Sequence, residues 1–379
     1  MNTNTFLFRT AVGAAATIAL AATGCGATTT SGDGSGGDGG GGGASVEEGF
    51  SIGLLLPDVH TARYEKFDRP YFEEAVGELC ENCEVKYQNA DQEATKQQSQ
   101  AEAMLTEGVE VLVLDAVDTE AAASIVQQAK SQDVPVVAYD RLAQGGVDYY
   151  VSFDNVTVGT VQGQALIKVL EEQETIDEGQ IVMINGSPTD PNADLFKQGA
   201  HEVLDGQVEI GAEFDTPGWS PDKAQQEMEQ AITDIGVENI VGVYAANDGM
   251  ASGVIAALKS AGVDEMPPVT GQDAEIAGIQ RIAAGDQYMT VYKAIRPEAN
   301  VAAEMAIAAA TGDEYESTEH PMTEVEDPDG NMIPSVLLEP VSVTEDNIMD
   351  TVVSDGFYTI EEICTDEYSD TDFCQEAMS

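Results

Sequence analysis

Charged and amide side chains stand directly after the short apolar runs of this sequence. They include Asp140, Arg141, Asn192, Asn247, Asp273 and Lys293. Asp and Asn after a strand often only cap the next helix, so each residue alone has an ordinary explanation. Together they supply donors and acceptors for the hydroxyl groups of a neutral polyol. The chemistry that this pattern predicts is hydrogen bonding to a small ligand.

Two rings add an apolar surface to this polar set. Trp219 is the only tryptophan, and Tyr64 precedes the first predicted helix. The C–H face of a sugar can lie on either ring, and a core position is the alternative for Trp219. The sequence has no G-x-S-x-G, H-E-x-x-H or P-loop motif to supply a nucleophile, a metal site or a phosphate cradle. An enzyme using Asp140 and Asp273 as paired carboxylates is the alternative, and we expect no enzyme.

The elements that position these residues alternate in type from residue 50 onward. Predicted strands are 51–56, 84–89, 109–116, 134–139, 149–153, 180–185, 208–214, 240–246, 268–271 and 288–293. Predicted helices are 71–79, 95–107, 119–131, 156–173, 193–204, 221–235, 250–261, 274–284 and 297–310. Apolar strands between helices of this length indicate parallel sheets covered on both faces. Two doubly wound α/β lobes would leave a cleft at the carboxyl ends of their strands.

At these residues the sequence resembles the periplasmic binding proteins of sugar ABC importers, in particular the D-xylose-binding group. The matching segments are 62–66, 138–142, 151–155, 186–188, 192–193, 247–248, 271–275, 282–285, 289–293 and 355–357. The resemblance covers about residues 50 to 358 and implies the two-lobed type I fold of that family. Tyr64 stands where the group usually carries tryptophan, and Pro191 replaces an asparagine.

The resemblance also implies a binding site, partners and lobe limits. The expected ligand residues are Arg63, Tyr64, Asp140, Arg141, Asn192, Trp219, Asn247, Asp273 and Lys293. The expected ligand is a monosaccharide, D-xylose first, with glucose, galactose and arabinose as alternatives, and a chemoreceptor role is compatible. The expected partners are an ABC permease and its ATPase, with no cofactor, no metal ion and a monomeric state.

The lobes of this family exchange chain more than once. The expected N-terminal lobe is 50–153 with 294–336, and the expected C-terminal lobe is 154–293 with 337–363 and a last strand around 336–343. Hinge segments are expected at 153–155, 293–294 and 335–337, and 364–379 is an acidic tail. A sugar-responsive repressor shares such a body but needs a basic DNA-binding headpiece, which an acidic chain does not supply.

The first 49 residues are typical of export and tethering. An apolar run at 11–22 follows Arg9 and is too short for a membrane-spanning helix, so 1–24 is a predicted signal peptide. Small residues before Cys25 resemble a lipoprotein cleavage box with an acylated Cys25, and a plain secretory signal is the alternative. The Gly- and Ser-rich segment 25–49 is a predicted disordered linker. We therefore expect anchoring at the outer face of the cell membrane.

Four cysteines remain in the exported part. Cys80 and Cys83 form one close pair, and Cys364 and Cys374 form another near the end of the chain. Two local disulfides are the simplest interpretation in an oxidising compartment. A metal site is not expected, because the three histidines lie far apart in the sequence.

The charge is extreme. Lys and Arg total 15 against 69 Asp and Glu, for a formal net charge of −54. Such a surface repels nucleic acid and anionic lipid. We interpret the charge as adaptation to high salt, which screens self-repulsion over a few ångströms, with an ordinary acidic surface as the alternative.

Overall fold

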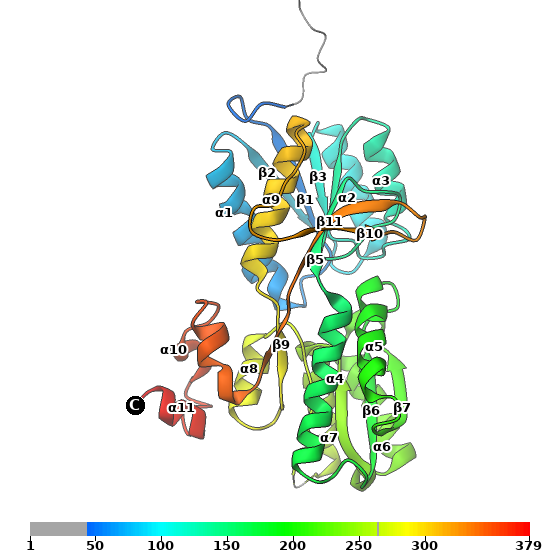
Figure 1. Ribbon diagram of the computed structural model, residues 1–379, viewed down its shortest axis with the longest axis vertical. Helices are drawn as coiled ribbons and strands as arrows, with labels where there is room; N and C mark the ends of the chain where they lie inside the picture. Colours follow the sequence, from blue (N-terminus) through cyan, green and yellow to red (C-terminus); the bar gives the residue numbers. More distant parts are fainter. Residues whose placement is uncertain (1–43, 264) are drawn as a thin grey trace, which may run out of the picture. The chain divides into compact units, whose positions relative to one another are not determined.

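Seven strands form the sheet of the N-terminal lobe, in the order β10-β11-β5-β4-β3-β1-β2 (Figure 1). They are β1 (Ser51–Leu56), β2 (Glu84–Asn89), β3 (Val111–Leu114), β4 (Val136–Tyr139), β5 (Tyr149–Phe153), β10 (Met322–Glu326) and β11 (Met332–Leu338). Neighbours pair in parallel except for β10 and β11, which form an antiparallel hairpin at the edge. The computed structural model describes residues 44–263 and 265–379.

Helices cover both faces of this sheet. They are α1 (Arg69–Leu79), α2 (Ala94–Thr106), α3 (Ala123–Lys130) and α9 (Ile295–Thr311). Strand β3 shows why: Val111 and Val113 join the core under α1 and α9, whereas Leu112 and Leu114 join the core under α2 and α3. Alternate side chains of a strand point to opposite faces, so an all-apolar strand needs cover on both.

The C-terminal lobe has a parallel sheet in the order β7-β6-β8. Its strands are β6 (Gln180–Asn185), β7 (Glu209–Asp215) and β8 (Ile240–Ala245), and its helices are α4 (Asn155–Glu172), α5 (Pro191–Leu204), α6 (Pro221–Ile235), α7 (Asp248–Ala261) and α8 (Ile276–Ala283). The two-lobed α/β class predicted from the sequence is confirmed, with antiparallel pairs added at the edges.

The predicted strand 268–271 is reduced to a single bridge between Val243 and Val269. Pro267 and Pro268 have no N–H to donate, which limits a ladder at this edge. Main-chain bonds still continue the sheet, since Tyr288 N donates to Val269 O at 3.0 Å. Beyond it, β9 (Thr290–Tyr292) pairs antiparallel with β12 (Val341–Val343).

The chain crosses between the lobes after β5, after β9 and after β11. The third crossing corrects the sequence-based boundary at 336/337 and the single strand expected at 336–343. Leu337 and Leu338 still pair with β5 of the N-terminal lobe, so β11 ends at Leu338 and the crossing lies at Glu339 and Pro340.

Residues 44–49 are not part of a linker, which corrects the predicted limit at 49. Ala44 and Val46 pack against the core, and Ala44 N donates to Ala310 O at 3.0 Å. The predicted signal peptide 1–24, Cys25 and the rest of the predicted linker up to residue 43 lie outside the described residues. Within the described part of the chain, no helix is both long enough and apolar enough to cross a bilayer.

The predicted tail 364–379 is folded. It carries α11 (Asp372–Ala377), which follows α10 (Ile360–Ile363), and Phe373 is buried in one apolar cluster with Ile279 of α8. A disulfide joins Cys364 to Cys374, and a second joins Cys80 to Cys83 at the end of α1. The composition of the tail suggested no such packing, because its few apolar residues are spaced among acids.

Candidate functional site

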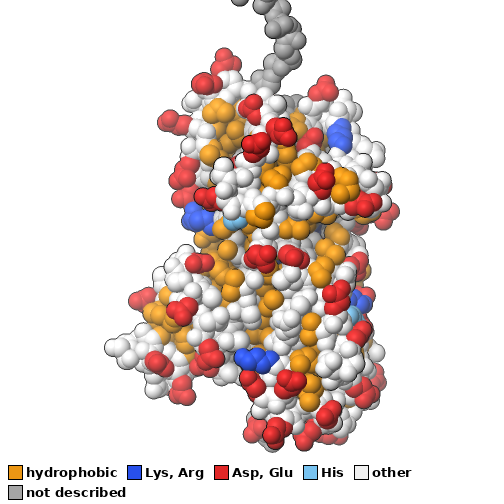
Figure 2. Space-filling view, viewed as in Figure 1, with side chains coloured by type: hydrophobic (Ala, Val, Ile, Leu, Met, Phe, Trp, Pro, Cys, Tyr) orange, Lys and Arg blue, Asp and Glu red, His pale blue; other side chains and the backbone are white. Residues whose placement is uncertain are grey.

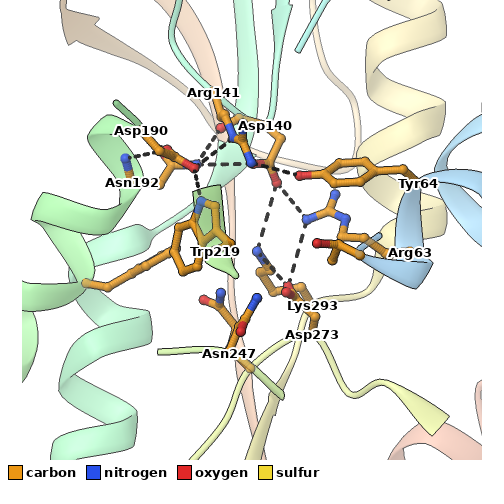
Figure 3. A pocket seen from close by; sticks show the side chains of 13 residues that line it. Arg63, Tyr64, Asp140, Arg141, Asp190, Asn192, Trp219, Asn247, Asp273 and Lys293 are labelled. Carbon is orange, nitrogen blue, oxygen red and sulfur yellow. Dashed lines mark hydrogen bonds and ion pairs between the residues drawn. The ribbon is translucent and has the colours of Figure 1, made fainter. Parts of the chain in front are cut away.

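All nine predicted ligand residues line one pocket between the two lobes (Figure 3). The side chains that line the pocket nearly fill it in this structure, because they bond to one another across the cleft. Its other lining residues are Thr61, Asp190, Phe196 and Gln272. The nine residues that the resemblance implied thus lie together, and the four other lining residues were not among the predicted ones.

Arg63 is the centre of a buried ion network. Its guanidinium donates twice to Asp68, at 2.7 and 3.0 Å, once to Asp140 at 2.7 Å and once to Glu298 at 2.8 Å. Arg63 is 3% exposed and Glu298 is fully buried. A planar fork with several carboxylate partners has one orientation, so Arg63 holds Asp140 in place.

Asp68 and Glu298 were missed by the sequence analysis. For Glu298 a signal existed, because it lies on the same face of α9 as Ile295, Ala299 and Ala302, which are all buried. A carboxylate on an apolar helix face needs a buried cation. Burial raises the pKa of Glu298 well above its usual range, although Arg63 opposes this.

Asp140 is held from both lobes. Its Oδ2 accepts from Arg63, while Asn192 Nδ2, from α5 of the C-terminal lobe, donates to Asp140 Oδ1 at 3.2 Å and to its main-chain oxygen at 2.9 Å. Burial alone would raise the pKa of Asp140, but Arg63, Lys293 and Arg141 outweigh it and lower the pKa to about 2. Asp140 is therefore a permanent acceptor and has no proton to give at neutral pH.

Arg141 spans the cleft. Its Nε lies 2.7 Å from Asp190 Oδ2 of the C-terminal lobe and 3.5 Å from Asp115 Oδ1 of its own lobe. Its Nη2 donates to the Tyr64 hydroxyl at 3.2 Å, so Tyr64 is tied to the ion network as well as offering a ring. Asp190 was not among the predicted ligand residues, and it pairs with Arg141.

Trp219 has the orientation that a stacking residue needs. It is buried, and its Nε1 donates to Asp190 Oδ2 at 3.2 Å. Its ring packs over Gly186, where an added Cβ would lie 2.1 Å from the indole. Only glycine therefore fits at 186, and the ring is directed into the pocket (Figure 3).

Lys293 and Asn247 complete the C-terminal side. Lys293 Nζ lies 3.0 Å from Asp273 Oδ1 and 3.9 Å from Asp140 Oδ2. Burial lowers the pKa of Lys293, but Asp273 and Asp140 raise it above its usual value, so Lys293 is cationic. Asn247 caps α7 through its Oδ1, which accepts from Met250 N at 2.8 Å. Asn247 thus both caps α7 and lines the pocket.

Three site residues have strained backbones. Asp140, Trp219 and Asp273 have φ angles of 58°, 54° and 83°, in the region that favours glycine. Such positions cost about 1–3 kcal/mol each and persist where the surroundings enforce them. Three of the eight non-glycine residues with positive φ in the described part of the chain therefore lie in this candidate site.

Two acceptors in the pocket have no hydrogen-bond donor. Among the described residues, they are Asn192 Oδ1 and Gln272 Oε1, both buried, whereas Asp273 Oδ1 has Lys293 as its partner. Hydroxyl groups of a ligand are suitable donors for such atoms. Outside this pocket, Asp58, His60 and Asp91 bring three metal-ligand atoms within 4.8 Å of one another, which the spacing of the histidines did not suggest.

Comparisons with known proteins agree with this geometry. Residues 52–314 match the family described as periplasmic binding protein domain. The D-xylose-binding periplasmic protein of Escherichia coli is 36% identical over 82% of this chain and 92% of its own length. The multiple sugar-binding periplasmic protein SbpA of Azospirillum brasilense is 35% identical over 72% of this chain and 80% of its own.

A solved structure gives the same fold. The ABC transporter solute-binding protein of Clostridium phytofermentans, with bound β-D-glucose, superimposes with a TM-score of 0.75 at 29% identity. The match covers 83% of this chain and 99% of that one.

Proposed function

The chain belongs to the periplasmic binding protein family, and we propose that it is the solute-binding lipoprotein of a sugar ABC importer. The pocket would hold one monosaccharide, D-xylose first, and deliver it to a permease driven by a separate ATPase. The observation that carries this proposal is the pair of unpartnered acceptors Asn192 Oδ1 and Gln272 Oε1 inside the pocket, beside the buried Asp140 and Asp273 carboxyl groups.

The mechanism is closure of the lobes on the ligand. Asp140 and Arg141 come from one lobe and Asn192 and Asp190 from the other, and these groups bond directly across the cleft. A sugar that bridges both lobes makes all its bonds only when they are closed, so binding shifts the population to that state. The closed surface then docks on the permease.

The ligand is proposed to be uncharged. Asp68, Asp115, Asp140, Asp190, Asp273 and Glu298 surround the cations Arg63, Arg141 and Lys293, and all nine side chains are buried. Each of these cations already pairs with an acidic side chain, so no cation is left to bind the carboxylate of a sugar acid. Multiple-sugar binding, including glucose, galactose and arabinose, is the second candidate, because SbpA is nearly as similar to this chain as the D-xylose-binding protein.

Catalysis is not proposed for this pocket. A glycosidase needs a carboxylic acid with a raised pKa beside a carboxylate nucleophile or base. The pKa of Asp140 is lowered to about 2, mainly by Arg63 and Lys293, against the effect of burial. Asp140 therefore lacks the proton that an acid catalyst must donate.

Isothermal titration with a panel of pentoses and hexoses tests the binding function. We expect saturable binding of D-xylose and weaker binding of hexoses. Equal affinities across the panel would favour the multiple-sugar role, and no heat with any sugar would refute sugar binding. A chromogenic glycoside assay of the same preparation should show no turnover.

The anchor is a separate part of the proposal. Cys25 lies outside the described residues, and its acylation is proposed from the cleavage box that precedes it. Metabolic labelling with a radioactive fatty acid should label the wild-type chain and leave Cys25→Ser unlabelled. Equal labelling of both, or of neither, would reject the anchor at Cys25.

A further inference from the structure

We propose that Asp248 is a positioning residue for the sugar site, which holds the segment 271–275 so that Gln272 and Asp273 face the pocket. This inference rests on the proposed sugar-binding function. Asp248 is the first residue of α7 and is fully buried, and it is not among the residues that line the pocket. Its neighbour Asn247 does line it.

The Asp248 carboxylate joins three separate pieces of chain. Gln287 Nε2 donates to Oδ1 at 2.6 Å, and the hydroxyl of Thr290, in β9, donates to Oδ2 at 2.9 Å. The main-chain N–H of Glu275, at the start of α8, also donates to Oδ2 at 2.9 Å. One side chain thus fixes the start of α7, the start of α8 and the strand that leads to Lys293.

The segment that Asp248 holds is the one that carries the ligand residues. Asp248 N donates to Gln272 O at 3.0 Å, so the two residues are bonded through the main chain as well. Asp273 and Ala274 have φ angles of 83° and 47°, and neither is glycine. A backbone in this region reverts to a relaxed form unless its surroundings enforce it. The hydrogen bonds that Asp248 accepts from Glu275 N and from the Thr290 hydroxyl hold the backbone next to Asp273 and Ala274 in this conformation.

Two glycines show how closely the chain wraps this carboxylate. An added Cβ on Gly271 would lie 2.0 Å from Asp248 Oδ1, and one on Gly278 would lie 2.3 Å from Oδ2. The backbone therefore touches both oxygens, and no longer side chain fits at 248. A residue that only capped α7 would not need this cradle, and Asn247 already provides the cap.

The ionised carboxylate suits this role, because all three of its side-chain contacts are donors. The titratable or charged groups that face it are Glu275, Arg281, Asp273 and Tyr358. Burial raises the pKa of Asp248 to about 7, opposed by Arg281 and by the bonds from Gln287 and Thr290. Ionisation therefore falls within the neutral range, and sugar affinity should rise as pH increases from about 6 to 8.

The test compares Asp248→Asn with wild type and with Met228→Ala. The amide is isosteric but places a donor against Gln287 or against Glu275 N and Thr290. Met228 is fully buried in α6 of the same lobe and belongs neither to the pocket nor to the segment 271–275, so its truncation controls for general destabilisation. Sugar affinity is measured by titration between pH 6 and 8, and amide hydrogen exchange is measured for peptides covering 272–276.

We expect Asp248→Asn to weaken sugar binding by about tenfold or more, since buried donors lose a carboxylate acceptor. It should also flatten the pH dependence and speed exchange at 273–275, while Met228→Ala keeps wild-type affinity and exchange there. Wild-type affinity and exchange in Asp248→Asn would overturn the inference. If wild type binds no sugar, the proposed function fails, and the exchange data alone still decide whether Asp248 holds the segment.

Discussion

Asn192 and Asp140 come from different lobes and are bonded to each other at 3.2 Å between Nδ2 and Oδ1. The same Nδ2 lies 2.9 Å from the main-chain oxygen of Asp140. Each lobe thus offers its polar groups to the other across the pocket. A ligand that enters must replace such bonds with its own hydroxyl groups, so affinity depends on groups that are already oriented.

Asp273→Ala should remove most of the sugar affinity. Asp273 is buried in the pocket, and its Oδ1 pairs with Lys293 Nζ at 3.0 Å. Losing one hydrogen bond to a charged group costs about 1.5–3 kcal/mol, which is about 10- to 150-fold in the dissociation constant. Titration calorimetry measures the dissociation constant of each variant. Asp286→Ala, which breaks a surface pair with Lys259 in the same lobe, should bind normally. Unchanged affinity in Asp273→Ala would contradict its role.

Arg63→Leu should destabilise the fold as well as abolish binding. It leaves Asp68, Asp140 and Glu298 buried without their cation. Breaking a buried ion pair by removing one partner costs about 3–5 kcal/mol of unfolding free energy. Urea unfolding measures the loss. Arg69→Leu is the matched control, because Arg69 and its partner Glu73 are both 39% exposed and such a pair is worth about 0–1 kcal/mol. Equal losses in the two variants would contradict the network's importance.

Much of this site could be predicted from the sequence, because the carboxyl ends of parallel strands meet at one edge. Asp140, Asn247 and Lys293 were found by that rule alone. Asp68 and Glu298 were not. Asp68 lies five residues from Arg63 in the same helical turns, whereas Glu298 reaches Arg63 through the packing of α9 on the sheet. The only sequence signal for that tertiary pair is an acidic residue on an apolar helix face.

The lobe boundaries show the same limit. The crossing after β11 was placed two residues early, because an apolar run such as 336–338 fits a strand of either lobe. Its register is set by pairing with β5, which is distant in sequence. The segment at Val269 was likewise predicted as a strand, although it forms only one bridge. An apolar pattern does not determine how many main-chain hydrogen bonds a segment at the edge of a sheet forms.

Gly186→Ala should weaken sugar binding, because the added methyl group would displace the Trp219 ring from the pocket. The new Cβ would lie 2.1 Å from the Trp219 indole, so the ring must leave its position and lose its bond to Asp190. We expect a loss of affinity with a red-shifted tryptophan emission, read from fluorescence titration of this single tryptophan. Gly77→Ala in α1 is the control, because its added Cβ meets no atom within 4 Å; sugar affinity and tryptophan emission should stay unchanged. Normal emission and affinity in Gly186→Ala would show that the ring's position is not needed.

The unfolding free energy should fall as pH rises from about 4 to 8. Burial raises the pKa of Asp248 to about 7 and that of Glu275 to about 8, above the value near 4 of an unfolded carboxyl. The folded state then binds these protons more tightly, and that advantage is lost as pH rises through the folded pKa. Asp140 acts in the opposite sense: its pKa of about 2 adds stability that is lost as pH falls below about 4. Urea unfolding at a series of pH values should show the unfolding free energy falling both above and below about pH 4.

Asp248→Asn isolates one of these contributions. The variant should show a shallower decline between pH 5 and 7 than wild type, while the acid limb below pH 4 stays the same. An unchanged slope between pH 5 and 7 would mean that Asp248 does not titrate in that range.

The melting temperature should rise with salt. The chain carries a formal net charge of −54, and Asp and Glu are spread over the visible face in Figure 2 with few Lys or Arg among them. The screening length falls from about 30 Å at 0.01 M to about 3 Å at 1 M salt, so repulsion between neighbouring carboxylates is largely removed. Thermal unfolding in 0.05 to 2 M KCl measures the gain. Converting the exposed Glu171, Asp177 and Glu178 to amides should raise the melting temperature at low salt and reduce the gain. A wild-type melting temperature that does not change over this range would reject adaptation to high salt.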